Sequence, residues 1–122
     1  MKKNLIEEKS FEFAKRIVKM YTHLKDKKQE FILSKQVLKC GTSIGANVHE
    51  AIYAESKSDF IHKLKIALKE ANETKYWLRL LFETGFIQES AYISINKDSE
   101  ELIKLLTAII KSTSKNEDSK KI

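Results

Sequence analysis

The sequence contains no proline, three glycines and one cysteine among its 122 residues. Because proline and glycine most often end helices and form turns, their scarcity indicates long helices with few, short connections. The single cysteine, Cys40, excludes a disulfide within the chain and suits a reducing, cytoplasmic compartment. The composition therefore predicts one helical domain held together by packing.

Long apolar runs are absent as well. No stretch of about eighteen consecutive apolar residues occurs, so no membrane-spanning helix is expected. The first ten residues, MKKNLIEEKS, carry lysines but no apolar core after them, which does not fit a signal peptide. A membrane is therefore not among the expected partners.

Patterns typical of catalytic and metal sites are also missing. Cys40 has no histidine placed to act as its base, and free cysteines are usually small buried apolar residues. Glu70 and Glu73 could suggest a di-iron bundle, but no Glu-x-x-His pattern accompanies them. Gly41 and Gly45 follow no strand, so they form no phosphate-binding loop. We expect no enzyme activity, no metal and no cofactor.

Positive charge is what the sequence has in excess. The net charge is +6, and residues 1–28 hold nine basic side chains against four acidic ones. Such an excess favours a polyanionic partner such as RNA or DNA. The alternative is that the lysines only keep the surface solvated.

The first helix is predicted over residues 10–27, with two different sides. Its buried side is expected to hold Phe11, Ala14, Ile17, Val18, Tyr21 and Leu24. Its other side carries a basic stripe of Lys9, Arg16, Lys19, His23 and Lys27. This α-helical stripe is the candidate nucleic-acid-binding surface, because basic groups at helical spacing can follow a phosphate backbone. An ordinary solvated face is the alternative.

The turn before the second helix is apolar. Phe31, Ile32 and Leu33 are expected to pack under the end of the bundle, and Ser34 is placed to cap a helix over residues 35–54.

Small and polar residues mark the middle of this second helix. Gly41 and Gly45 lie four residues apart, which suggests close approach by another helix. Thr42, Ser43 and Asn47 flank them and are expected to meet the glutamates of the next helix in a polar network.

The third helix, predicted over residues 58–84, gives the strongest helical pattern. Ser58 is placed to cap its start and Gly85 to end it. One apolar stripe is expected to face the core, and it contains Ile61, Leu64, Leu68, Ala71, Leu78 and Phe82.

A second face of the third helix is unusual. It lies roughly opposite the first stripe and contains Ile66, Glu70, Glu73, Tyr76, Trp77 and Leu80. A helix that is apolar on two sides is usually buried on two sides. These residues are predicted to contact another copy of the chain. The alternative is that Trp77 covers the edge of the monomer core.

The last helix is predicted over residues 88–112, and Asn96 marks where it could be interrupted. The polar tail, residues 113–122, is expected to be disordered. Since four helices with short connections favour antiparallel neighbours, the predicted fold is an all-α, antiparallel up-down-up-down four-helix bundle.

Several of these segments together resemble a known family. They are Ser43-Ile44-Gly45-Ala46-Asn47, Asp59-Phe60, the run from Ala67 to Ala71 with Glu73, and Trp77-Leu78. The runs Leu33–Ala51 and Ser56–Leu81 are similar to bacterial four-helix-bundle proteins encoded in intervening sequences of 23S ribosomal RNA genes. The accessory variability protein of diversity-generating retroelements is similar to the same family. At Lys39-Cys40-Gly41 the chain departs mildly from the family, which usually has Arg and Ala there.

The resemblance implies an antiparallel bundle that assembles as a barrel-like homopentamer, in agreement with the second face around Trp77. The retroelement relatives imply a basic surface that binds a reverse transcriptase and nucleic acid. Two hypotheses follow. The first is an oligomeric, non-enzymatic bundle that binds RNA or a ribonucleoprotein. The second is a protein-interaction scaffold with no nucleic-acid binding.

Overall fold

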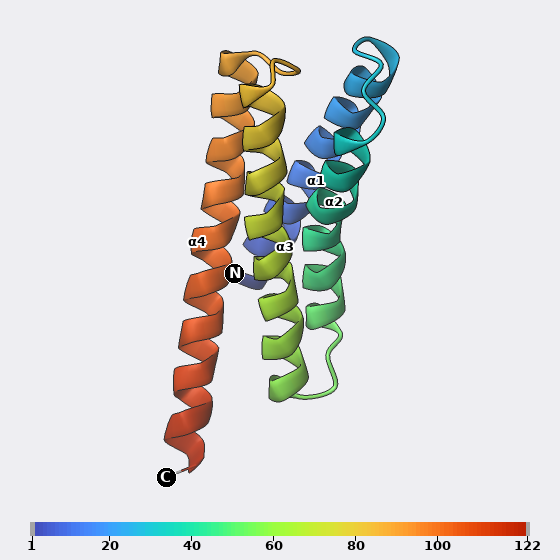
Figure 1. Cartoon of the computed structure of the whole chain (residues 1–122). Helices are drawn as coiled ribbons and strands as arrows, with labels where there is room; N and C mark the ends of the chain where they lie inside the picture. The colour runs from blue at the N-terminus through green and yellow to red at the C-terminus, as the bar shows by residue number, and fades with distance from the viewer. Residues whose placement is uncertain (1, 122) are drawn as a thin grey trace.

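Four helices make up the fold. The computed structural model describes the backbone of residues 2–121 and the side chains of residues 5–115. The helices are α1 (Lys2–Asp26), α2 (Leu33–Ile52), α3 (Lys57–Glu83) and α4 (Glu89–Lys121), and successive helices run antiparallel (Figure 1). The described residues contain no strand, and none of their helices is long and apolar enough to cross a membrane. The predicted all-α, antiparallel four-helix bundle is confirmed.

The helices pack in chain order. α2 lies between α1 and α3, and α3 lies between α2 and α4. The pairing of α1 with α4 is the least extensive, and Figure 1 shows the N-terminal end of α1 reaching toward the middle of α4. The seam between these two helices is therefore the most open side of the bundle.

Each helix contributes one buried stripe to the core. The largest fully buried side chains are Phe13, Ile17, Leu24, Val37, Ile44, Val48, Leu64, Leu78, Leu81, Ile95, Leu102 and Leu106. Burial of apolar surface at about 25 cal/mol per Å² is the main stabilising term for such a core. The predicted stripe of α3 is largely confirmed, although Leu68 and Phe82 are only half-buried.

The predicted buried side of α1 is wrong in part. Phe11 and Val18 are 64% and 46% exposed, whereas Phe13, absent from the prediction, is buried. Ile17 and Leu24 are buried as predicted. The helix carries two neighbouring apolar stripes, and only the one that contains Phe13 and Ile17 faces the other helices.

Gly41 and Gly45 allow α1 and α2 to approach closely, as predicted. A Cβ at Gly41 would lie 2.8 Å from Cγ1 of Ile17. A Cβ at Gly45 would lie 3.3 Å from the backbone oxygen of Ser10. The small size of both glycines therefore leaves room for α1 to pack closely against α2.

At the ends of α3, the predicted N-cap is wrong and the predicted terminating glycine is confirmed. Ser56, and not Ser58, is the N-cap, because its hydroxyl accepts a hydrogen bond of 3.0 Å from the backbone N–H of Asp59. Gly85 follows the helix with a φ of 87°, the left-handed conformation that glycine adopts most easily.

Two helices are longer than their predicted bounds. α1 begins at Lys2, and α4 continues without a break at Asn96 to Lys121, through the tail predicted to be disordered. This tail contains neither proline nor glycine, so no residue in it stops a helix. The last residue of the predicted tail, Ile122, lies outside the described residues.

Candidate nucleic-acid interface

The N-terminal half of the predicted basic stripe faces α4. Lys9 Nζ lies 3.1 Å from Glu101 Oε1. Arg16 Nη1 lies 2.5 Å from Asp98 Oδ2, and its Nη2 donates a hydrogen bond of 3.0 Å to a serine hydroxyl of α4. The charges of Lys9 and Arg16 are thus balanced by carboxylates of α4. These two ion pairs join α1 to α4 across the open seam.

The C-terminal half of the stripe faces solvent. Lys19, His23 and Lys27 are exposed, and none of the three forms an ion pair with another described residue. This half leads directly into the connection between α1 and α2. We call residues 23–35, which end α1 and begin α2, the hairpin tip.

The hairpin tip is basic and also exposes apolar side chains. Its exposed lysines are Lys25, Lys27, Lys28 and Lys35. Phe31 and Ile32 are 52% and 74% exposed, so the prediction that they pack under the bundle is wrong. Only Leu33 of the predicted apolar turn packs against the core.

Glu30 fixes the conformation of the hairpin tip. Its carboxylate accepts hydrogen bonds from the backbone N–H groups of Ile32, Leu33 and Ser34 at 3.2, 2.9 and 2.7 Å. Glu30 thereby caps α2 in place of Ser34, whose hydroxyl instead donates to the backbone oxygen of Glu30 at 2.8 Å. The chain reverses at Gln29, which has a φ of 52°.

The same contacts determine the charge of Glu30. Burial of the side chain, which is 8% exposed, raises its pKa, but the backbone hydrogen bonds outweigh burial and hold the pKa below its ordinary value. The carboxylate is therefore ionised at neutral pH and turned toward the start of α2. Among the described residues, no lysine forms an ion pair with this carboxylate.

The remaining charges of the tip are almost all positive. Its other acidic residue, Asp26, lies 3.9 Å from Lys25 Nζ. Lys27, Lys28 and Lys35 form no ion pair among the described residues. Lysines around an exposed phenylalanine are typical of surfaces that hold phosphates while an aromatic ring stacks on a base.

The structure brings the six predicted interface residues together on one face of α3. Ile66, Glu70, Trp77 and Leu80 are half-buried, whereas Glu73 and Tyr76 are exposed. Trp77 Nε1 donates a hydrogen bond of 3.4 Å to Glu73 Oε1, and the ring of Tyr76 meets the indole edge-on at 5.1 Å between centroids. Trp77 also packs against the core. Contact with another copy remains a prediction.

The polar residues of α2 bond within their own helix. Asn47 Nδ2 donates to the backbone oxygen of Ser43 at 2.9 Å and to its hydroxyl at 3.1 Å. Thr42 donates to the backbone oxygen of Leu38 at 2.7 Å. None of the described contacts joins these groups to Glu70 or Glu73, so the predicted network does not form within the chain, and a network at an interface stays a prediction.

Cys40 is 3% exposed and lies among the core residues of α2. Burial raises the pKa of its thiol, so the thiol stays protonated and is a poor nucleophile. Among the described residues, no three potential metal ligands lie together.

Comparison with known proteins identifies the family. A family model described as the 23S rRNA-intervening sequence protein matches residues 2–108. The chain belongs to this family. A crystal structure of a protein with unknown function from the S23 ribosomal protein family of Bacteroides thetaiotaomicron VPI-5482 is similar to this 23S rRNA-intervening sequence protein, with a TM-score of 0.90 and 58% sequence identity. The match covers 91% of this chain and 99% of that chain. No curated protein matches.

Membership in the 23S rRNA-intervening sequence protein family confirms the resemblance carried by the segments around Ser43–Asn47 and Trp77-Leu78. The family match and the similar crystal structure agree with the four-helix fold. They assign no role to any side chain.

Proposed function

We propose that this protein is a non-enzymatic, self-associating bundle that binds RNA or a ribonucleoprotein through the hairpin tip and the adjacent exposed half of the α1 stripe. One observation carries the proposal: Lys27, Lys28 and Lys35 are exposed and lie within four residues of the exposed Phe31 in the sequence, and none of the three lysines forms an ion pair among the described residues. The lone buried thiol of Cys40 supports a reducing cytoplasm as the compartment.

The test compares two triple variants with equal charge change. Lys27→Glu/Lys28→Glu/Lys35→Glu alters the tip, and Lys65→Glu/Lys97→Glu/Lys104→Glu alters exposed lysines of α3 and α4. We expect the tip variant to lose affinity for single-stranded RNA by about tenfold or more, because it removes phosphate contacts. The control variant should lose clearly less. Equal losses would exclude the tip as the binding surface.

Phe31→Ala tests the aromatic part of the same surface. If Phe31 stacks on a base, its loss should weaken RNA binding by about fivefold or more, since such stacking contributes about 1–3 kcal/mol. Tyr53→Ala, at an exposed aromatic outside the tip, serves as the matched control. If Phe31→Ala bound RNA with unchanged affinity, only the charged side chains of the surface would contribute to binding.

A protein-interaction scaffold is the second candidate, favoured by exposed apolar side chains outside the tip. Phe11 and Val18 form an outward stripe on α1, and Tyr76 is 62% exposed on α3. Partners captured from lysate that persist after nuclease treatment, and that Phe11→Ser/Val18→Ser releases, would favour this function over RNA binding.

A further inference from the structure

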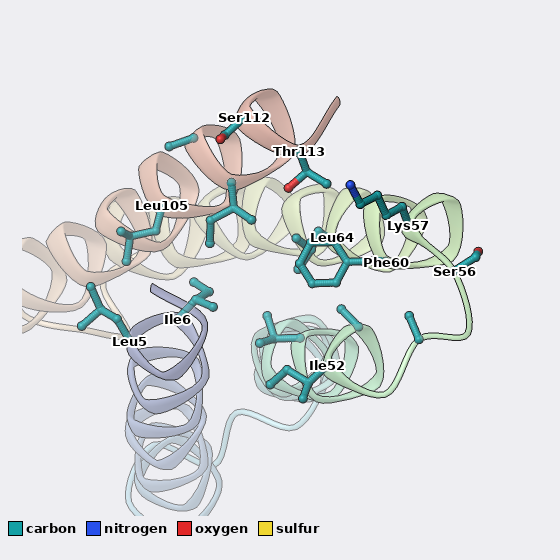
Figure 2. A pocket seen from close by; sticks show the side chains of 15 residues that line it. Leu5, Ile6, Ile52, Ser56, Lys57, Phe60, Leu64, Leu105, Ser112 and Thr113 are labelled. Carbon is teal, nitrogen blue, oxygen red and sulfur yellow. The ribbon is translucent and has the colours of Figure 1, made fainter. Parts of the chain in front are cut away.

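A groove lies at the end of the bundle opposite the hairpin tip, where α1 no longer covers the other helices. Figure 1 shows the N-terminal end of α1 reaching only the middle of α4, while α3 and α4 continue past it. The groove holds a cavity of about 640 Å³, walled by the N-terminal end of α1, the C-terminal end of α2, the start of α3 and the second half of α4 (Figure 2). Because a four-helix bundle closes its core with four helices, the place of the fourth helix is open at this end.

The walls of the groove are mainly apolar. All four helices contribute apolar side chains, among them Leu5 of α1, Ile52 of α2 and Ile109 of α4. Ile52 and Ile109 are half-buried and pack against the core, so the groove is continuous with the interior. On α4 the lining runs from Leu105 to Thr113, which corresponds to about 12 Å, or about two helical turns, at 1.5 Å per residue. A groove of this length and polarity suits the apolar face of a short amphipathic helix.

A basic stripe borders the groove on α4. Ala108 lines the groove, and Lys104 and Lys111 lie four residues before it and three after it, so both are its neighbours on the helix surface. Lys115 continues the stripe by one more turn. All three lysines are exposed, and none forms an ion pair among the described residues. Glu55, in the connection between α2 and α3, is exposed but pairs with none of them.

The charge of α4 changes sign where α1 begins to cover it. Glu101, one turn before Lys104, is paired with Lys9 of α1 at 3.1 Å, and Asp98 is paired with Arg16. The carboxylates of α4 that face α1 are thus matched by basic side chains of that helix. The lysines of α4 beside the groove have no such match among the described residues. A helix that occupied the open place would therefore need acidic side chains along this edge.

We propose that this groove binds an amphipathic helix of another protein, one that carries acidic residues beside its apolar face. The apolar side chains of that helix fill the space between Ile52 and Ile109, and its carboxylates lie along Lys104 and Lys111. The two features that select this partner are the apolar groove of about two turns and the unpaired basic edge on α4. The proposal is independent of RNA binding, because the cavity lining and the hairpin tip share no residue.

A synthetic peptide tests the groove. It has about fourteen residues, near the length at which isolated helices begin to form, and carries leucine at positions i, i+3, i+4 and i+7 with glutamate on both flanks. A second peptide, with lysine in place of each glutamate, is the matched control. With fluorescein labels and the full-length protein, anisotropy titration should show that the acidic peptide binds about tenfold more tightly than the basic one. Added salt should reduce this difference.

Reversing the charge of the basic edge tests the selectivity. Lys104→Glu/Lys111→Glu should weaken binding of the acidic peptide by about tenfold, because attraction becomes repulsion. Lys65→Glu/Lys97→Glu makes the same charge change at exposed lysines that do not line the groove and should leave the affinity nearly unchanged. The triple variant of the hairpin tip should also bind the peptide normally. Loss of RNA binding and loss of peptide binding are thereby measured separately.

Two alanines of α4 provide a matched pair of variants for the apolar part. Ala108 is exposed and lines the groove, so Ala108→Trp fills the groove without disturbing the core. Ala91 is equally exposed but lies near the opposite end of the helix. Ala108→Trp should abolish binding of the acidic peptide, and Ala91→Trp should not. Helical circular dichroism of both variants shows that the fold is retained.

Four results would overturn the proposal. The first is that the wild-type protein binds neither peptide, or binds both equally. The second is peptide binding that Ala108→Trp leaves unchanged. The third is RNA binding that Lys104→Glu/Lys111→Glu abolishes, because the basic edge would then serve RNA. The fourth is a native mass that Ala108→Trp reduces to that of one chain, because the groove would then hold a second copy of the protein.

Discussion

Glu30 is the side chain that connects the conformation of the hairpin tip to its charge. Three backbone amides at the start of α2 bond its carboxylate, and this carboxylate forms no ion pair with the described lysines of the tip. Because its pKa is lowered in the folded protein, the ionised carboxylate stabilises the fold above the pKa of an unfolded glutamate. That stabilisation is lost as pH falls through the lowered pKa of the folded state.

We predict that Glu30→Ala lowers the free energy of unfolding by about 1–2 kcal/mol at neutral pH, as expected for a lost helix cap. The difference from wild type should shrink as pH falls below the ordinary glutamate pKa of 4.5. Urea titrations at several pH values measure this. Glu55→Ala, at an exposed glutamate, is the control, and a loss that did not change with pH would contradict the account.

Gly41 is the second residue whose role is decided by local geometry. A Cβ there would lie 2.8 and 2.9 Å from two carbons of Ile17, which is itself fully buried. We predict that Gly41→Ala destabilises the protein by about 1–3 kcal/mol through overpacking. In a double-mutant cycle, the cost of Gly41→Ala should fall when Ile17→Ala is also present. Additive effects would show that the two residues do not share this contact.

At the scale of helices, the seam between α1 and α4 is closed by side chains at the surface. Lys9 and Arg16 reach across it to Glu101 and Asp98, and the pairing of these two helices is otherwise the least extensive in the bundle. The basic residues of α1 near its N-terminus therefore hold α1 to α4, and those near the tip face solvent.

Exchanging the charges of one ion pair tests this division. We predict that Arg16→Asp and Asp98→Arg each destabilise the protein slightly and that the double variant recovers most of the loss. The coupling should stay below about 1 kcal/mol, because both groups are more than one third exposed. RNA affinity should be nearly equal in wild type and double variant. Loss of RNA binding in the stable double variant would show that Arg16 belongs to the binding surface.

Periodicity was sufficient to predict the four helices, because each has a stripe of apolar residues at helical spacing. It could not choose between the two neighbouring stripes of α1, since Phe11 and Phe13 are equally apolar and only α2 and α4 decide which one is buried.

The cap of α2 was missed for a similar reason. Ser34 is the statistically preferred capping residue, but the carboxylate of Glu30 reaches three amides at once. A glutamate four residues before an expected cap was the available signal.

For the whole molecule, we propose that the protein self-associates through the α3 face around Trp77. We predict that Trp77→Ala and Leu80→Lys reduce the native mass to that of one 14.2 kDa chain while the helical circular dichroism is retained. Ile93→Lys, at an exposed apolar residue of α4, should leave the native mass unchanged. Native mass spectrometry checks this, and a wild-type mass equal to one chain would exclude the oligomer.

RNA affinity of the nuclease-treated protein across a salt series tests the central claim most directly. If Lys27, Lys28, Lys35 and their exposed neighbours contact phosphates, the logarithm of affinity should fall linearly with the logarithm of salt concentration, with a slope of about −2 or steeper. The slope should become shallower by about 2 in the tip triple variant, since each lost phosphate contact with a single strand contributes about 0.7. No binding at low salt, or a slope that the tip variant leaves unchanged, would contradict RNA recognition by the hairpin tip.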